Sequence, residues 1–263
     1  MITNTPSKYW VELSNDGKEL IKLWGYDHFK QTVSVLLYND FGFNKIKGTI
    51  SDNYNSYLRQ LWDYLYKALP NKILDKLEEP MEGDPMVIEY KGRNVSFDLA
   101  TSALEYNTMS TYIDFTKINS INEIGAGYGK TAYVILTLHP HIKYHIFDIE
   151  PSINIAGRYL PSVLPNADIE FSLPDGLADE KCDLFIGINC IHEMTMNQIQ
   201  SYFDYADKNA QYFYMTCWFK TVVPGENLSL SIWDYPVKPS WKVLHVDAFL
   251  QFKFFEALFK CQK

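Results

Sequence analysis

The chain has 263 residues, of which 47% are hydrophobic, and its formal net charge is −8. This length suggests one large domain, or a core domain with a smaller companion. Contacts to a nucleic acid backbone depend on clustered Lys and Arg, and no long basic run offsets the acidic balance, so we expect no nucleic acid partner.

The N-terminal stretch does not read as a targeting segment. It lacks a basic region followed by an apolar core, which is the pattern of a signal peptide. No apolar run along the chain approaches the roughly 20 residues of a membrane span. The four cysteines form no C-x-x-C pair, and we expect them to be reduced and buried. We therefore predict a cytoplasmic protein with no membrane partner.

Residues 1–115 have a mainly helical and irregular pattern. A first helix is indicated by apolar residues near helical spacing, and Pro70 ends it. These apolar residues are Tyr54, Tyr57, Leu58, Leu61, Leu65 and Leu69. The stretch SFDLATSALEYNTMSTYIDF predicts a second helix. We interpret residues 1–115 as a helical N-terminal cap that helps to bind the substrate.

From residue 116 to residue 263, short apolar runs alternate with helical stretches. The helical stretches are KTAYVILTL, SINIAGRYL and MNQIQSYFDYADK. The expected strands are 121–124, 144–148, 168–171, 183–188, 211–217, 241–246 and 254–259. This alternation predicts an α/β fold with a Rossmann-like, mostly parallel sheet. The last two strands have no clear helix between them, so we expect an antiparallel edge.

The stretch INEIGAGYGKTAYVIL contains a glycine-rich turn between a strand and a helix. A phosphate-binding P-loop, G-x-x-x-x-G-K-[ST], would need glycine at position 124, which is Ile124. The dinucleotide fingerprint G-x-G-x-x-G would need glycine where the chain has Lys130. The pattern that remains is E-x-G-x-G-x-G, formed by Glu123, Gly125, Gly127 and Gly129 with Ala126 between the first two glycines.

This pattern resembles the first motif of class I methyltransferases that use S-adenosylmethionine. In that family the glycines let the backbone approach the aminoacyl part of the cofactor without Cβ clashes. An acid at the end of the next strand accepts hydrogen bonds from the ribose hydroxyls. Asp148 has that position, and we expect Ile149 after it to contact the cofactor as well, while Glu150 is a competing acid. We further expect Asp175, in the PDG turn, to meet the adenine amino group.

The strand DLFIGI opens into the loop NCIHEM, and ligands of open α/β sheets bind beyond such strand ends. We expect Asn189 to contact the cofactor. Histidine is the natural base near neutral pH, so we predict that His192 removes a proton from an acceptor hydroxyl. Glu193 is either the base itself or the group that holds the imidazole. Thr195 and Gln198 indicate a capping box for the next helix.

Two further segments contain residue types that occur in binding sites. The histidines of HPHIKYH do not obviously converge, so we predict no metal. The long segment 218–241 is rich in Pro and Trp and is expected to act as a lid over the substrate. Trp218 and Trp233 within it are candidates to face a sugar ring.

Three segments together resemble the sugar O-methyltransferase family of bacterial surface-polysaccharide clusters: EIGAGYGKTAYVIL, YHIFDIEPSINIAGRYL and DLFIGINCIHEM. The resemblance covers roughly residues 118–217. It implies S-adenosylmethionine as the cofactor and a sugar hydroxyl as the acceptor, on a small molecule such as a nucleotide-linked sugar for capsule or other polysaccharide biosynthesis. The residues leave a monomer and a homodimer open. They also leave open an ATP- and magnesium-dependent phosphotransferase and a non-catalytic cofactor-binding partner subunit.

Overall fold

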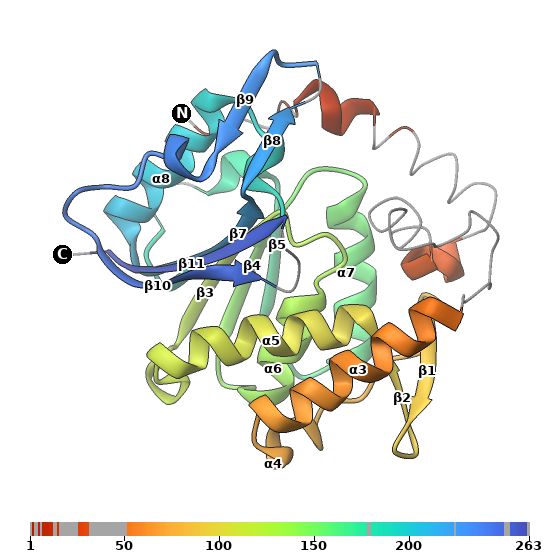
Figure 1. Cartoon of the computed structure of the whole chain (residues 1–263). Coiled ribbons are helices and arrows are strands. Elements are labelled where there is room, and N and C mark those ends of the chain that lie inside the picture. Colours follow the sequence, from red (N-terminus) through yellow and green to blue (C-terminus); the bar gives the residue numbers. More distant parts are fainter. Residues whose placement is uncertain are drawn as a thin grey trace.

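The computed structural model describes residues 2, 5, 7–12, 15, 26–31, 52–177, 180–223, 225–249 and 253–261 (Figure 1). Its main helices are α3 (Asp52–Ala68), α4 (Asn71–Leu74), α5 (Phe97–Tyr112), α6 (Lys130–Leu138), α7 (Ser152–Val163) and α8 (Met196–Asn209). The strands of the central sheet are β3 (Ser120–Ile124), β4 (Lys143–Phe147), β5 (Ile169–Ser172), β6 (Cys182–Ile188), β7 (Ala210–Trp218), β10 (Lys242–Phe249) and β11 (Phe254–Lys260).

The central sheet has the spatial order β10-β11-β7-β6-β3-β4-β5. The five strands from β7 to β5 are parallel, whereas β11 runs antiparallel to both β7 and β10. This arrangement confirms the predicted Rossmann-like α/β fold with an antiparallel strand near the end of the chain. All seven strands expected from the sequence are present, with bounds that differ by a few residues at most.

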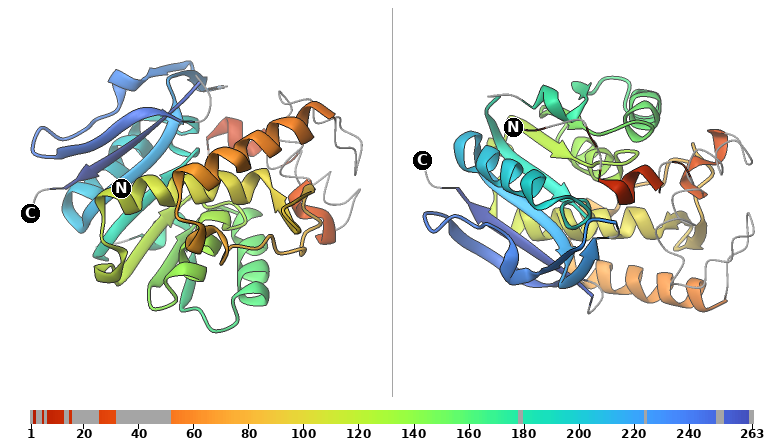
Figure 2. Two further views of the ribbon diagram at one scale, coloured as in Figure 1. Left: turned by 60° about the horizontal axis from the view of Figure 1, so that its bottom comes forward. Right: turned by 90° about the horizontal axis from the view of Figure 1, so that it is seen from above.

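Helices cover both faces of the sheet, which gives three layers (Figures 1 and 2). The sequence of β6 explains why helices lie on both faces. Successive side chains of a strand point to opposite faces, and from Leu184 on those of β6 are apolar on both. Leu184 and Ile186 pack in the hydrophobic cluster that includes α3, α5, α6 and α7. Phe185 packs in the second cluster, which includes α8. Because both faces of β6 are buried, this strand reads as a nearly continuous apolar run.

Local signals fix where the helices next to the candidate site begin. The side chain of Ser96 caps α5 by accepting a hydrogen bond from the backbone N–H of Leu99. Thr195 and Gln198 form the predicted capping box of α8. Helix α6 follows Gly129, whose φ of 89° lies in the left-handed region that favours glycine.

Two hairpins were not expected from the sequence. The hairpin of β1 (Val87–Tyr90) and β2 (Arg93–Ser96) lies in the part predicted to be helical and irregular. Its two-residue turn at Lys91 and Gly92 has positive φ at both positions, the geometry that suits tight hairpins. The second hairpin, β8 (Lys220–Val223) with β9 (Leu228–Ser231), occupies the segment predicted to be a lid.

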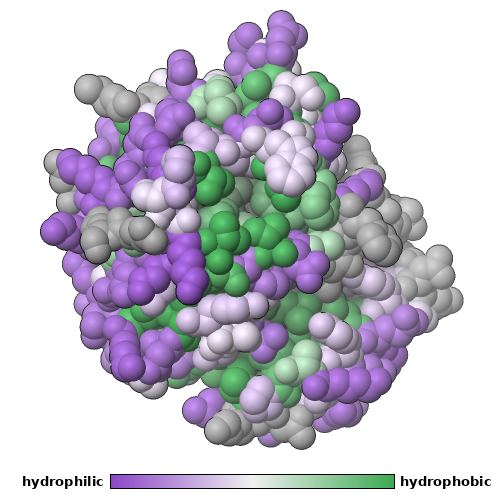
Figure 3. All heavy atoms as spheres, turned by 60° about the vertical axis from the view of Figure 1, so that its left-hand side comes forward, coloured by the Kyte–Doolittle hydropathy of each residue, from purple (hydrophilic) through white to green (hydrophobic). Residues whose placement is uncertain are grey.

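The division into residues 1–115 and 116–263 stays a prediction. In the structure, α3 and α5 share one hydrophobic cluster with β3, β4 and β6. Among the described residues, the structure contains no helix that is both long and apolar enough to span a bilayer. The face shown in Figure 3 is largely hydrophilic, with hydrophobic residues gathered in a central area.

Candidate active site

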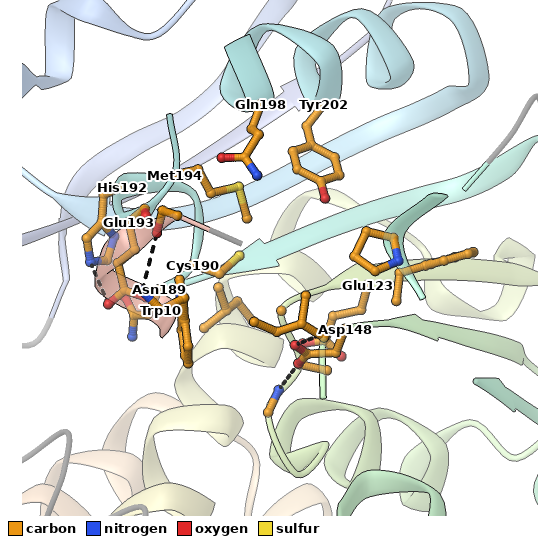
Figure 4. Close-up of a pocket in the computed structure, with 18 of the residues that line it drawn as sticks. Trp10, Glu123, Asp148, Asn189, Cys190, His192, Glu193, Met194, Gln198 and Tyr202 are labelled. Carbon is orange, nitrogen blue, oxygen red and sulfur yellow. Dashed lines mark hydrogen bonds and ion pairs between the residues drawn. The ribbon is translucent and has the colours of Figure 1, made fainter. Parts of the chain in front are cut away.

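A pocket opens beyond the carboxyl ends of β3, β4 and β6, where the sequence analysis placed the reactive edge (Figure 4). Helix α8 contributes Gln198 and Tyr202 to its wall, and the N-terminal segment contributes Trp10. The pocket contains most of the residues predicted for the site. These are Glu123, Gly125, Ala126, Gly127, Asp148, Ile149, Asn189, His192 and Glu193. Side chains that are far apart in the sequence therefore meet at one edge of the sheet.

The glycine loop has the conformation that its sequence predicts. Gly125 and Gly127 have φ values of 63° and 62°, in the left-handed region. A Cβ on Gly125 would clash with the side chain of Cys190, so this glycine permits the close approach of two loops. A Cβ on Gly127 would meet no atom within 4 Å. Because Gly127 also lines the pocket, its backbone is open to a ligand there.

Gly129 lies outside the described lining of the pocket. A Cβ at this position would clash with the side chain of Leu160 on α7. The third glycine of the motif therefore lets α6 start close to α7. Its contact with the cofactor stays a prediction.

The Asp148 carboxylate links the end of β4 to the glycine loop. Its Oδ2 accepts a hydrogen bond from the backbone N–H of Gly127 at 2.8 Å, and its Oδ1 accepts one from Ile149 at 2.7 Å. Burial raises the pKa of this carboxyl to about 7, against the effect of the two hydrogen bonds. Glu150, the competing acid, is exposed and does not line the pocket. Of the two acids, Asp148 therefore lines the pocket and Glu150 does not, and the ribose contact of Asp148 stays a prediction.

Glu123 lines the pocket from the next-to-last position of β3, two residues before the first glycine of the loop. It is buried, and its Oε2 accepts a hydrogen bond from the Tyr144 hydroxyl at 2.7 Å. Burial raises the pKa of its carboxyl to about 8. Asp175, on the short 3-10 helix Pro174–Gly176, is exposed and lies outside the described lining, whereas its neighbour Pro174 lines the pocket.

His192 and Glu193 lie on the short 3-10 helix Ile191–Glu193 that follows β6 (Figure 4). The His192 Nε2 and the Glu193 Oε1 are 3.6 Å apart. Burial lowers the pKa of His192 to about 3 and raises the pKa of Glu193 to about 8. The His192 Nδ1 and Glu193 Oε2 atoms have no hydrogen-bond partner among the described residues. The pair therefore has unsatisfied polar atoms in a pocket, a pattern that suits a reacting ligand.

Asn189 is held at the end of β6 by neighbouring β7. Its backbone has a φ of 52°, an uncommon value that asparagine tolerates better than most residues. Its Oδ1 accepts a hydrogen bond from the Thr216 hydroxyl at 2.9 Å, and its N–H donates to the Thr216 carbonyl. These bonds orient Asn189 toward the pocket that it lines.

The N-terminal segment was missed as part of the site, because nothing in its sequence marks a motif. Residues 8–12 are helical, and Thr5, Ser7, Tyr9 and Trp10 line the pocket. The Ser7 hydroxyl donates a hydrogen bond to the Glu193 carbonyl at 2.7 Å, and Gln198 donates one to the Thr5 carbonyl at 2.9 Å. The start of the chain thus crosses over the loop that carries Glu193.

The segment 218–241, predicted to be a lid, does not cover the pocket with its described residues. Trp218 lines the pocket, but among the described residues of 219–241 none does. Trp233 is 87% exposed. The β8–β9 hairpin instead holds the N-terminal segment, since the backbone N–H of Lys8 donates to Glu226 at 2.8 Å. The hairpin therefore contacts the N-terminal segment, which lines the pocket, and the described residues of the hairpin do not line the pocket themselves.

The histidines of HPHIKYH have separate structural partners. His139 bonds the Tyr106 hydroxyl, His141 the Ile118 carbonyl, and His145 the Ser172 hydroxyl. Within the described ranges, no group of three or more His, Cys, Asp or Glu side chains could hold a metal ion. All four cysteines are buried, as predicted, and none of them is part of a disulfide among the described residues.

The buried carboxyls make the stability of the ligand-free protein depend on pH. Glu123, Asp148 and Glu193 hold their protons up to a pKa of about 7 or 8, against ordinary values of 3.8–4.5. Their contribution to stability is therefore largest at low pH and is lost as the pH rises through 7–8. The lowered pKa of His192 has the opposite effect, but only below its ordinary value of 6.5.

We therefore expect the melting temperature to fall by about 4–10 °C between pH 6.5 and pH 8.5. Thermal unfolding of the ligand-free protein at the two pH values measures this fall. Glu193→Gln should make the fall smaller, because one titrating carboxyl is removed. Glu150→Gln, which changes an exposed carboxyl, should leave it unchanged. A melting temperature that is constant or rises between pH 6.5 and pH 8.5 would contradict the raised pKa values of these three carboxyl groups.

Comparison with known proteins bears on the part of the chain that builds this pocket. Residues 96–208 match a family model described as an O-methyltransferase domain, a stretch that covers less than half of the chain. It runs from the cap of α5 almost to the end of α8 and contains the glycine loop, Asp148 and His192. The match agrees with the methyltransferase class and with the cofactor S-adenosylmethionine that the glycine loop predicts.

Several solved structures resemble the fold at low sequence identity. A protein from Pyrococcus horikoshii OT3 is 14% identical, with 60% of this chain and 88% of that chain covered and a TM-score of 0.49. TehB from Haemophilus influenzae is 12% identical, with 60% and 61% covered and a TM-score of 0.48. The glycopeptide N-methyltransferase MtfA, complexed with S-adenosylmethionine, is 12% identical, with 66% and 100% covered and a TM-score of 0.46. No curated protein matches the sequence.

Proposed function

We propose that this protein is an S-adenosylmethionine-dependent O-methyltransferase whose acceptor is a sugar hydroxyl, on a nucleotide-linked sugar used for bacterial surface polysaccharide. The observation that carries the methyltransferase part is the glycine loop, joined by a hydrogen bond to Asp148 in a pocket that also holds His192. The family match over residues 96–208 supports transfer to oxygen. The sugar acceptor is supported by the resemblance of the three segments described in the sequence analysis.

The residues present fit the cofactor. The open space at Gly127 accepts a ligand against the backbone, and the Asp148 carboxylate is placed to accept hydrogen bonds from ribose hydroxyls. When bound, S-adenosylmethionine supplies a methyl group activated by a sulfonium leaving group. Trp10 and Trp218 add flat apolar surface to the same pocket. This surface suits both the cofactor and a ring-shaped acceptor, and it excludes water.

The chain's own part in the chemistry is to place the acceptor hydroxyl and remove its proton. Burial lowers the pKa of His192 to about 3, so the imidazole is neutral near pH 7 and has a free nitrogen lone pair to accept that proton. Burial alone makes the resulting imidazolium unfavourable. The Glu193 carboxylate, 3.6 Å from Nε2, offsets this cost once it is ionised. We assign proton removal to His192 and stabilisation of the imidazolium to Glu193.

A phosphotransferase is disfavoured by the positions of the residues after the glycines. In a P-loop the Lys and the Ser/Thr serve the phosphates and the magnesium ion. Here the Lys130 Nζ donates to the Thr101 hydroxyl at 3.0 Å and lies 3.6 Å from Glu105. The Thr131 hydroxyl donates to Glu105 at 2.8 Å. Both side chains thus hold α5 against α6.

The experiment that tests the acceptor is transfer of a labelled methyl group from S-adenosylmethionine to a panel of small molecules. The panel contains nucleotide-linked sugars, free sugars and simple phenols. Label on a nucleotide-linked sugar is the expected result. Label on a phenol alone would replace the sugar by a flat aromatic acceptor, which the aromatic pocket lining would also accommodate. Cofactor binding without transfer to any class would favour the non-catalytic partner subunit.

A further inference from the structure

Asp98 is a pocket carboxylate that neither the sequence motifs nor the proposed chemistry uses. It lies in the first turn of α5 and lines the pocket beside Tyr128. Its side chain is 7% exposed. The Oδ2 atom accepts a hydrogen bond from the Tyr128 hydroxyl at 2.6 Å, whereas Oδ1 is buried with no partner among the described residues. A buried, half-satisfied carboxylate is costly unless another group completes it.

The nearby lysines do not complete it. The Lys30 Nζ lies 5.7 Å from the centre of the Tyr128 ring, but it is bonded to Glu79 at 2.7 Å. Lys130 is bonded to Thr101 and lies near Glu105. Over the described part of the chain, no ion pair includes Asp98. The Oδ1 atom is therefore an unpaired acceptor in the pocket wall that is left for a ligand.

The position of Asp98 indicates which part of the ligand it meets. Tyr128 follows Gly127 directly, so Asp98 lies at the glycine-loop side of the pocket. Asp148 follows β4 directly, and in the proposed function its carboxyl group binds the ribose. The aminoacyl part of the cofactor is expected against the glycines, and it carries an ammonium group. An ammonium supplies both the positive charge and the N–H donors that the Oδ1 atom lacks.

We propose that Asp98 binds the α-ammonium group of the cofactor's amino acid end. This inference rests on the proposed use of S-adenosylmethionine and adds to it a binding residue from α5, outside the glycine motif. It gives the pocket two acids with separate tasks: Asp148 holds the ribose end, and Asp98 holds the charged amino acid end. The ligand would then be fixed at both ends, with its reactive sulfur between them.

Isothermal titration with two ligands tests this role. S-Adenosylhomocysteine carries the amino acid end, and methylthioadenosine lacks it. Asp98→Asn keeps an oxygen that can accept from Tyr128 but removes the charge. We expect this variant to bind S-adenosylhomocysteine about 10- to 100-fold more weakly and methylthioadenosine within about twofold of the wild-type protein. Asp247→Asn, which removes an exposed carboxylate on β10, is the matched control and should change neither affinity.

The outcomes separate this inference from the function on which it rests. Asp98 does not bind the ammonium if the variant binds S-adenosylhomocysteine like the wild-type protein, or if it loses affinity for both ligands equally. In either case S-adenosylmethionine remains the proposed cofactor. If the wild-type protein binds neither ligand, the proposed function fails, and the role of Asp98 fails with it. If the variant does not fold, the wild-type protein can still test whether the α-ammonium group contributes to binding. It must bind the analogue of S-adenosylhomocysteine without the α-amino group about 10- to 100-fold more weakly, and equal affinity would overturn the proposal.

Discussion

His192→Ala is expected to lower the turnover number by about 10²–10⁴-fold while leaving the affinity for S-adenosylhomocysteine nearly unchanged. The His192 imidazole lines the pocket 3.6 Å from Glu193, and its removal takes away the group to which we assign the proton of the acceptor hydroxyl. Steady-state kinetics with the acceptor identified in the panel measures the first quantity, and isothermal titration measures the second.

The matched control for this change is His141→Ala. The His141 imidazole is exposed, bonds the Ile118 carbonyl and does not line the pocket, so full turnover is expected. Full turnover in His192→Ala itself would transfer the base to Glu193 or to a group of the substrate. A loss of cofactor binding together with turnover would instead indicate that His192 supports the pocket, since its ring lies 5.8 Å from that of Trp218.

Asp148→Ala is expected to weaken binding of S-adenosylhomocysteine by about 1.5–3 kcal/mol, or roughly 10- to 150-fold. Two terms contribute. The ribose hydroxyls lose a charged acceptor, and the glycine loop loses the bond from Gly127 that holds it near β4. Isothermal titration gives the affinity, and thermal unfolding of the ligand-free variant shows how much of the effect is a loss of loop order.

Glu150→Ala is the control that the sequence itself suggests, because both acids follow the same strand. Glu150 is exposed and outside the pocket, so its removal should not change the affinity. If Glu150→Ala weakened binding and Asp148→Ala did not, the two acids would exchange roles and the placement of the ribose would be wrong.

The sheet was predictable because each of its strands carries a local signal. Residues 184–188 have no polar side chain, since helices cover both faces of the sheet, and α8 begins at a capping box that its sequence predicts. The antiparallel edge followed from the missing helix between the last two strands. The β1–β2 hairpin was missed although Lys91 and Gly92 form a turn signal, because its strands have only four residues each.

The centre of the site was predictable for a similar reason: the glycine loop, Asp148 and the loop from Asn189 to Glu193 each follow a strand directly. Residues that reach the pocket from other elements have no such marker. Asp98 reads as an ordinary acid in the first turn of a helix, and Trp10 lies in a segment without a motif. Only the tertiary structure brings α5 and the N-terminal segment to the strand ends.

The claim on which the account depends is that the glycine loop serves S-adenosylmethionine and not a nucleotide triphosphate. Isothermal titration of the purified protein with S-adenosylhomocysteine, and in parallel with ATP plus magnesium, tests it most directly. We expect the protein to bind S-adenosylhomocysteine alone. Binding of ATP alone would contradict it, and would mean that GAGYGKT is a phosphate loop despite the one-residue difference in spacing.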